Sequence, residues 1–171
     1  TLTSVNADTV MVKETLASGE VFAVSGAGKS LAFNIDEAFT IVAGSLTSGF
    51  TSGSSTSSSP FGSFSSFVDC TSTTVCGNGT SPPTFSGPLS FEVFNAAGLT
   101  PSDFISNGTA FFASDIGVPK TGGGFNTGNV ASDSGVSLAP PPSTPEPSTM
   151  ILLGLGSFAM FVVKKRSSRS S

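Results

Sequence analysis

The chain has 171 residues, seven of them basic and 11 acidic, and its formal net charge is −4. Charged residues make up only 11% of the chain, while Ser and Thr supply roughly three residues in ten, a weakly charged composition that is common in secreted β-proteins. Before the C-terminal tail, three lysines stand against all 11 acidic residues, so nothing would neutralise phosphates and a nucleic-acid partner is excluded.

The N-terminal residues show no export signal, because Thr1-Leu2-Thr3-Ser4 contains no Met, basic segment or apolar segment. The outward-facing anchor described below nevertheless requires export of the preceding domain. We therefore expect a secretory signal upstream of Thr1.

Residues 1–132 predict one β-domain, either an antiparallel β-sandwich or a jelly roll. Apolar residues recur at every second position in several short segments, as half-buried strands require. Gly, Ser, Asn and Pro separate these segments at short intervals, which is typical of antiparallel folds with tight turns. The predicted strands contain Val10/Val12, Val21–Val24, Leu31/Phe33/Ile35, Phe39/Ile41 and Leu89/Phe91/Val93.

The segment from Ala23 to Ser30 ends in Gly-Lys-Ser, like a phosphate-binding loop. It lacks the first glycine of that motif, since Ala23 stands there, and an alternating strand pattern follows where the motif needs a helix. A β-turn that exposes Lys29 to solvent is the better interpretation.

Residues 47–66 are so rich in Ser and Gly that ordering their backbone would cost much entropy, and we expect a long surface loop there. Farther along, Asn78-Gly79-Thr80 and Asn107-Gly108-Thr109 match the N-glycosylation pattern, but Asn-Gly also favours tight turns, which is the preferred interpretation. Thr100–Phe104 predicts one helical turn, with Thr100 as cap and Pro101 at the first helical position.

Cys70 and Cys76 are the only cysteines, and the short loop between them can bring them within disulfide distance. Export favours the oxidised form. The alternative is two buried free thiols, since a zinc site would need further soft ligands that the chain does not supply.

The chain offers little for catalysis or cofactor binding. It has no His, which excludes Ser-His-Asp and Cys-His machinery, and its acidic residues are scattered except for Asp36-Glu37. No calcium-loop pattern is present, so solvated surface acids are the default. We expect no enzyme activity, no metal and no cofactor. The aromatic residues are 16 Phe without Trp or Tyr, which favours core packing over a sugar platform.

The C-terminal part arranges three physical elements in order. Residues 133–149 form a Pro-rich linker that ends in Pro145-Glu146-Pro147. Residues 150–163 are uncharged and apolar, and about 21 Å of helix, slightly short of the bilayer core, predicts a tilted transmembrane span. Residues 164–171 form a basic tail that the positive-inside rule keeps in the cytoplasm. The anchor residues are Met150, Ile151, Leu152, Leu153, Leu155, Phe158, Phe161, Val162 and Val163, followed by the basic Lys164, Lys165, Arg166 and Arg169.

This arrangement resembles the PEP-CTERM sorting signal of proteins that are processed by an exosortase in Gram-negative-type bacteria. The resemblance implies recognition by a membrane transpeptidase-like enzyme and cleavage near Glu146 and Pro147. The protein would then reach the cell surface or an extracellular polysaccharide matrix. A Gram-positive sortase signal would need Leu-Pro-x-Thr-Gly, which is absent.

A looser resemblance covers two segments of the preceding domain. Phe111-Phe112-Ala113-Ser114-Asp115-Ile116, followed by residues 124–130, is similar to a strand pair of some secreted PEP-CTERM ectodomains. Phe125 interrupts the second element. This resemblance implies a related β-domain and no activity.

We therefore expect an exported structural or adhesive protein of the cell surface, the extracellular matrix or a biofilm. Its expected partners are an exosortase and the membrane. The alternatives are a module that binds exopolysaccharide, and a tail-anchored surface protein that is never cleaved.

Overall fold

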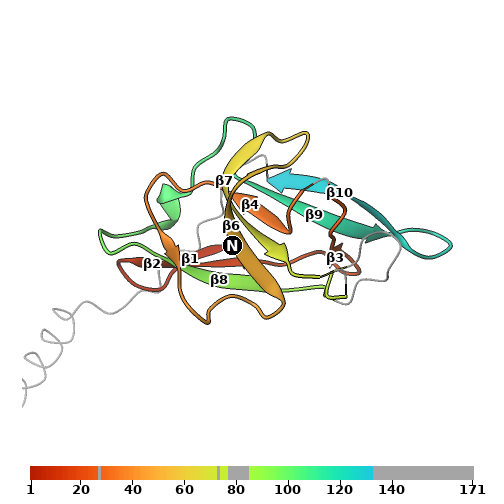
Figure 1. Cartoon of the computed structure of the whole chain (residues 1–171), viewed down its shortest axis with the longest axis horizontal. Coiled ribbons are helices and arrows are strands. Elements are labelled where there is room, and N and C mark those ends of the chain that lie inside the picture. Colours follow the sequence, from red (N-terminus) through yellow and green to blue (C-terminus); the bar gives the residue numbers. More distant parts are fainter. Residues whose placement is uncertain (27, 73, 77–84, 133–171) are drawn as a thin grey trace, which may run out of the picture. The chain divides into compact units, whose positions relative to one another are not determined.

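A computed structural model describes residues 1–26, 28–72, 74–76 and 85–132. The chain divides into two units, and every described residue belongs to the first, Thr1–Ala139. The described elements are ten strands and one 3₁₀ turn (Figure 1): β1 (Leu2–Ser4), β2 (Thr9–Glu14), β3 (Val21–Phe22), β4 (Leu31–Phe33), β5 (Thr40–Ile41), β6 (Phe50–Ser57), β7 (Ser63–Cys70), β8 (Leu89–Phe94), η1 (Pro101–Asp103), β9 (Phe112–Pro119) and β10 (Phe125–Ser132).

The strands form two antiparallel sheets, which confirms the prediction of a mainly β domain. The first sheet has the order β1-β2-β8-β5. Its central pair sets Val10 opposite Val93 and Val12 opposite Phe91. Every second residue of β8 is buried, as the alternating sequence pattern predicts for a sheet with one face in the core.

The second sheet has the order β10-β9-β4-β7-β6, and β3 pairs with β9 beside β4. Ala32 of β4 faces Phe67 of β7 on one side and Ala113 of β9 on the other. The β9–β10 hairpin turns through Gly122, Gly123 and Gly124, which all have positive φ angles that only glycine adopts readily.

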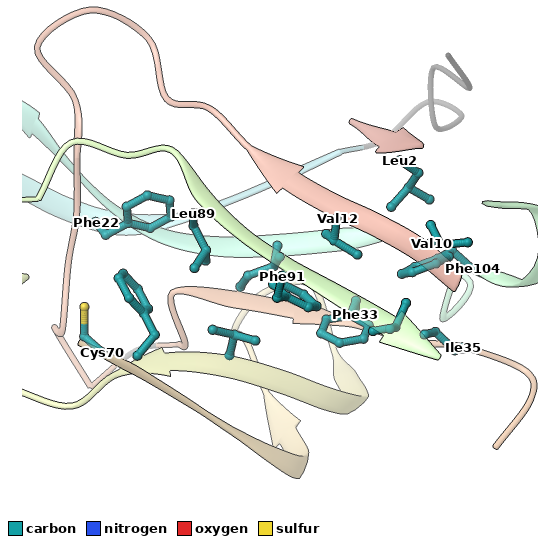
Figure 2. Packing of buried hydrophobic residues seen from close by; sticks show 14 of the residues in the cluster. Leu2, Val10, Val12, Phe22, Phe33, Ile35, Cys70, Leu89, Phe91 and Phe104 are labelled. Carbon is teal, nitrogen blue, oxygen red and sulfur yellow. The ribbon is translucent and has the colours of Figure 1, made fainter. Parts of the chain in front are cut away.

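One hydrophobic core joins the two sheets. Phe33 of β4 lies at its centre, with its ring centroid 5.6 Å from that of Phe91 in the opposite sheet and 5.9 and 6.0 Å from those of Phe39 and Phe104. Figure 2 shows Phe33 and Phe91 next to each other, with Phe22 and Leu89 toward one end of the core and Phe104 toward the other. Phenylalanine thus supplies all of the aromatic packing between the layers.

A smaller cluster lies apart from this core. It consists of Ala32, Phe64, Ala110 and Ala113, with Phe61 and Ala131 packed against it. The Asn107 side chain fixes the β6–β7 turn beside this cluster, because its Nδ2 donates hydrogen bonds to the carbonyls of Phe61 and Ser63 at 2.8 and 3.1 Å.

The prediction of a surface loop over residues 47–66 is wrong. These residues contain all of β6, the turn and the first half of β7. β6 is an edge strand exposed along most of its length, so its sequence needs no apolar alternation, and its ladder with β7 holds the backbone. The missed signal is the alternation of Phe64, Ser66, Val68 and Cys70, which are all buried.

Other local predictions agree with the structure or need small corrections. The turn at Pro101–Asp103 forms with Pro101 in its first turn, and the Asp103 carboxylate accepts a hydrogen bond from the Thr100 N–H at 2.6 Å. Asn107-Gly108 makes a turn in which Gly108 has φ +95°. Three strands are shorter than expected: the one at Val21–Val24 ends at Phe22, Ile35 lies beyond β4 in an isolated bridge to Phe104, and Phe39 precedes β5.

Candidate functional site

The predicted sorting and anchoring residues all lie outside the described residues. They comprise Pro145, Glu146, Pro147, the apolar residues of 150–163, and Lys164, Lys165, Arg166 and Arg169. Among the described residues, no helix is long and apolar enough to cross a membrane. Asn78-Gly79-Thr80 also lies outside them.

The segment that resembles a phosphate-binding loop is looped out of the second sheet. The Ala23 N–H donates to the Asp115 carbonyl at 2.9 Å, and the Asp115 N–H donates to the Lys29 carbonyl at 2.8 Å. Both ends of the segment therefore bond to one residue of β9, and the described residues between them leave the ladder. A strand, β4, follows it, so the helix that a phosphate site needs is not formed here.

A buried carboxylate holds this looped-out segment in place. Asp115 is fully buried, and its Oδ2 accepts hydrogen bonds from the N–H and the hydroxyl of Ser25 at 2.8 and 2.6 Å. Its Oδ1 is buried without a hydrogen-bond partner among the described residues. The expectation that the acidic residues are solvated is therefore wrong for Asp115.

Lys29 is also held rather than free in solvent, contrary to our expectation. Its Nζ lies 2.8 Å from Oδ2 of Asp69 and 4.8 Å from the centroid of the Phe67 ring. The other carboxylate oxygen of Asp69 accepts hydrogen bonds from the N–H and the hydroxyl of Ser30, both at 3.3 Å. A phosphate would have to displace Asp69, so this arrangement fixes the backbone rather than binding an anion.

A third carboxylate, that of Glu14, forms a hydrogen bond between the two sheets. Glu14, at the end of β2, accepts a hydrogen bond from the hydroxyl of Ser114 on β9. The residue as a whole is half-buried, but its Oε2 is buried and has no hydrogen-bond partner among the described residues. Burial raises the pKa of Glu14 to about 7, although the Ser114 hydrogen bond opposes the rise.

A disulfide joins Cys70, the last residue of β7, to Cys76, with their Cα atoms 6.2 Å apart. Cys76 is fully buried and belongs to the main core. Figure 2 shows the Cys70 sulfur at the end of the core that contains Phe22. The bridge therefore anchors the chain where it leaves the second sheet.

A hollow of about 180 Å³ lies where the edges of the two sheets come together. Its walls are the rings of Phe33, Phe39 and Phe67 with Ile41, and Ser52, Gly53 and Ser66 add polar groups. Ile41 belongs to β5, the edge of the first sheet, while Ser52 and Gly53 belong to β6, the edge of the second.

The described groups do not form a catalytic arrangement. Asp115, Asp69 and Glu14 each bond to a serine or a lysine within the protein, and sequence reasoning missed all three because each is isolated along the chain. One weak sequence signal for a buried carboxylate is an acidic residue inside an otherwise uncharged strand, such as Asp115 in β9, in a chain that also contains a Gly/Ser-rich turn.

Comparison with known proteins identifies the tail. Residues 143–166 match the family model described as the PEP-CTERM protein-sorting motif. The chain carries a PEP-CTERM sorting signal. This signal includes Pro145-Glu146-Pro147, the whole apolar run and the first three basic residues. It marks an exported protein that is targeted to an exosortase at the membrane. No curated protein and no solved structure matches the chain.

Proposed function

We propose that this PEP-CTERM protein is a non-catalytic structural component of the cell surface or extracellular matrix. The sorting signal carries the proposal, because it directs a protein to an exosortase and adds no chemistry of its own. The described domain agrees with a structural role. Two residues of the segment that resembles a phosphate-binding loop interact with carboxylates of the domain: Lys29 forms an ion pair with Asp69, and Ser25 donates a hydrogen bond to Asp115.

The tail suggests how the protein is delivered. Residues 150–163 enter the membrane, and the basic residues after them hold the C-terminus in the cytoplasm. An exosortase then cleaves near Glu146 and Pro147, which releases the domain to the surface or to the matrix. In the uncleaved alternative the same tail remains as the anchor.

Binding of an extracellular polysaccharide is the weaker alternative. Sugar platforms usually present an aromatic ring to solvent beside hydrogen-bonding groups. Every phenylalanine in the described part of the chain is buried or half-buried, and the exposed large apolar side chains there are Val5, Met11, Ile105, Val118 and Val130.

Intact-mass spectrometry of the protein recovered from its native host tests the sorting step. We expect the mature protein to lack residues 150–171. Replacing Pro145, Glu146 and Pro147 together by Ala should leave the full C-terminus in place and retain the protein in the membrane fraction.

The linker provides a matched control for this experiment. Changing Pro140, Pro141 and Pro142 to Ala removes three prolines close to the signal but outside it. This variant should be processed like the natural chain. Recovery of the complete C-terminus from the matrix fraction of the natural chain would refute cleavage and leave the tail anchor as the function of residues 150–163.

A further inference from the structure

Strand β6 forms an open edge of the second sheet. It is eight residues long and, among the described strands, pairs only with β7. Residues 51–57 are exposed or half-buried. Long edge strands with free N–H and C=O groups are templates for pairing with another chain, and proteins usually protect them with charges, prolines or short length. β6 contains neither a charge nor a proline.

The direction of the backbone groups in β6 follows from its neighbours. Thr71 donates its N–H to the carbonyl of Gly49 at 2.9 Å, so Gly49 faces β7. Hydrogen-bonded and non-hydrogen-bonded residues alternate along an antiparallel pair. The backbone N–H and C=O groups of Thr51 and Gly53 therefore also point toward β7. The N–H and C=O groups of Ser52 and Ser54 therefore point to the open edge.

The surroundings of this edge favour a second copy of the same chain as the partner. No charged residue occurs between Glu37 and Asp69, a stretch that contains β5, β6 and most of β7. The described residues carry nine acidic side chains against three lysines, so like charges oppose association of two copies more at other surfaces than at β6. At β6 they meet without like charges.

The other edges are poorer candidates. β1 and β5 have only three and two residues, which is itself a protection against pairing. β10 is long, but it leads directly into residues that the structure does not describe.

We propose that two copies of this protein associate through antiparallel β6–β6 pairing around a two-fold axis at Gly53. Ser52 of each copy then faces Ser54 of the other, and the two pairs exchange four backbone hydrogen bonds. The two Gly53 residues meet at the axis, and the Phe67 ring of each copy covers its own Gly53 on one face of the sheet. The pairing uses the regular half of β6, before Ser55, whose φ of 63° interrupts the ladder with β7.

Sedimentation velocity of the full-length chain in density-matched detergent tests the dimer. Ser54→Pro removes the outward N–H and leaves the β7 ladder intact, because that N–H points away from β7. We expect it to raise the dimer dissociation constant at least tenfold, with unchanged circular dichroism and an intact disulfide. Ser54→Ala is the matched control, which removes the hydroxyl, keeps the N–H and should dimerise like the natural chain.

Cysteine cross-linking tests the register and does not depend on the proline variant being folded. Residues in a hydrogen-bonded pair have Cα atoms about 5.5 Å apart, within disulfide range. A Ser52→Cys chain co-expressed with a differently tagged Ser54→Cys chain should form a mixed disulfide dimer, whereas Ser102→Cys in both chains should not. A monomeric natural chain, equal dimerisation of the Pro and Ala variants, or absence of the mixed disulfide would each overturn the proposal.

Discussion

At the scale of single residues, the carboxylates of this domain act as internal hydrogen-bond acceptors. Asp115 and Asp69 hold the two ends of the looped-out segment between β3 and β4, through Ser25 and through Lys29 and Ser30. Burying a carboxylate is costly unless it is paired or hydrogen-bonded, so each contact offsets a large desolvation term. Removing a hydrogen-bond or ion-pair partner of one of these carboxylates should therefore lower the free energy of unfolding.

Lys29→Ala should lower the free energy of unfolding by about 1 kcal/mol, because it removes a partly exposed ion pair with Asp69 and a cation–π contact with Phe67. Urea denaturation of the full chain measures this change. Lys120→Ala, in the exposed β9–β10 turn, is the control and should change nothing. Equal stability of the two variants would mean that Lys29 contributes no more than a solvated turn lysine.

At the scale of elements, the sequence predicts strands only where one face is buried. β2 and β8 alternate apolar and polar residues and can be predicted, whereas β6 cannot, because an edge strand exposed on both faces carries no such pattern. The buried acids escape prediction for a related reason, since their partners come from distant parts of the chain. The sorting signal is predictable because its three parts are contiguous.

The short strand β4 contributes Phe33, a fully buried ring that packs on three other phenylalanine rings. Phe33→Ala should lower the free energy of unfolding by about 3–5 kcal/mol, because its ring contacts Phe39, Phe91 and Phe104 in a fully buried site. Thermal or urea unfolding measures the loss. Phe94→Ala removes a half-buried ring from the end of β8 and should cost clearly less. Similar losses in the two variants would argue against a core centred on Phe33.

At the scale of the whole molecule, Glu14 makes the free energy of unfolding of the two-sheet domain depend on pH. Its pKa is about 7 in the folded protein and close to its ordinary value of 4.5 in the unfolded chain. Between these values the unfolded chain has released its proton and the folded protein has not. The free energy of unfolding therefore falls as pH rises from about 5 to about 7, and this contribution is constant above that range.

Glu14→Gln should abolish this part of the pH dependence, since the amide keeps an acceptor for the Ser114 hydroxyl and carries no charge. We expect the variant to equal the natural chain at pH 5 and to exceed it by up to about 3 kcal/mol at pH 8. Urea unfolding at several pH values gives the comparison. Glu37→Gln, at an exposed position, should follow the natural profile, and an unchanged slope in Glu14→Gln would show that this carboxyl titrates normally.

The strand order also bears on how the chain folds during export. Each sheet is completed by a late segment that pairs with an early one: Val10 on β2 faces Val93 on β8, and Ala32 on β4 faces Ala113 on β9. A chain that crosses a membrane from its N-terminus presents β2 and β4 long before their partners emerge. Neither sheet can close until β8 and β9 have crossed, and such distant pairing slows folding. The topology itself therefore delays closure of both sheets until export of the domain is nearly complete.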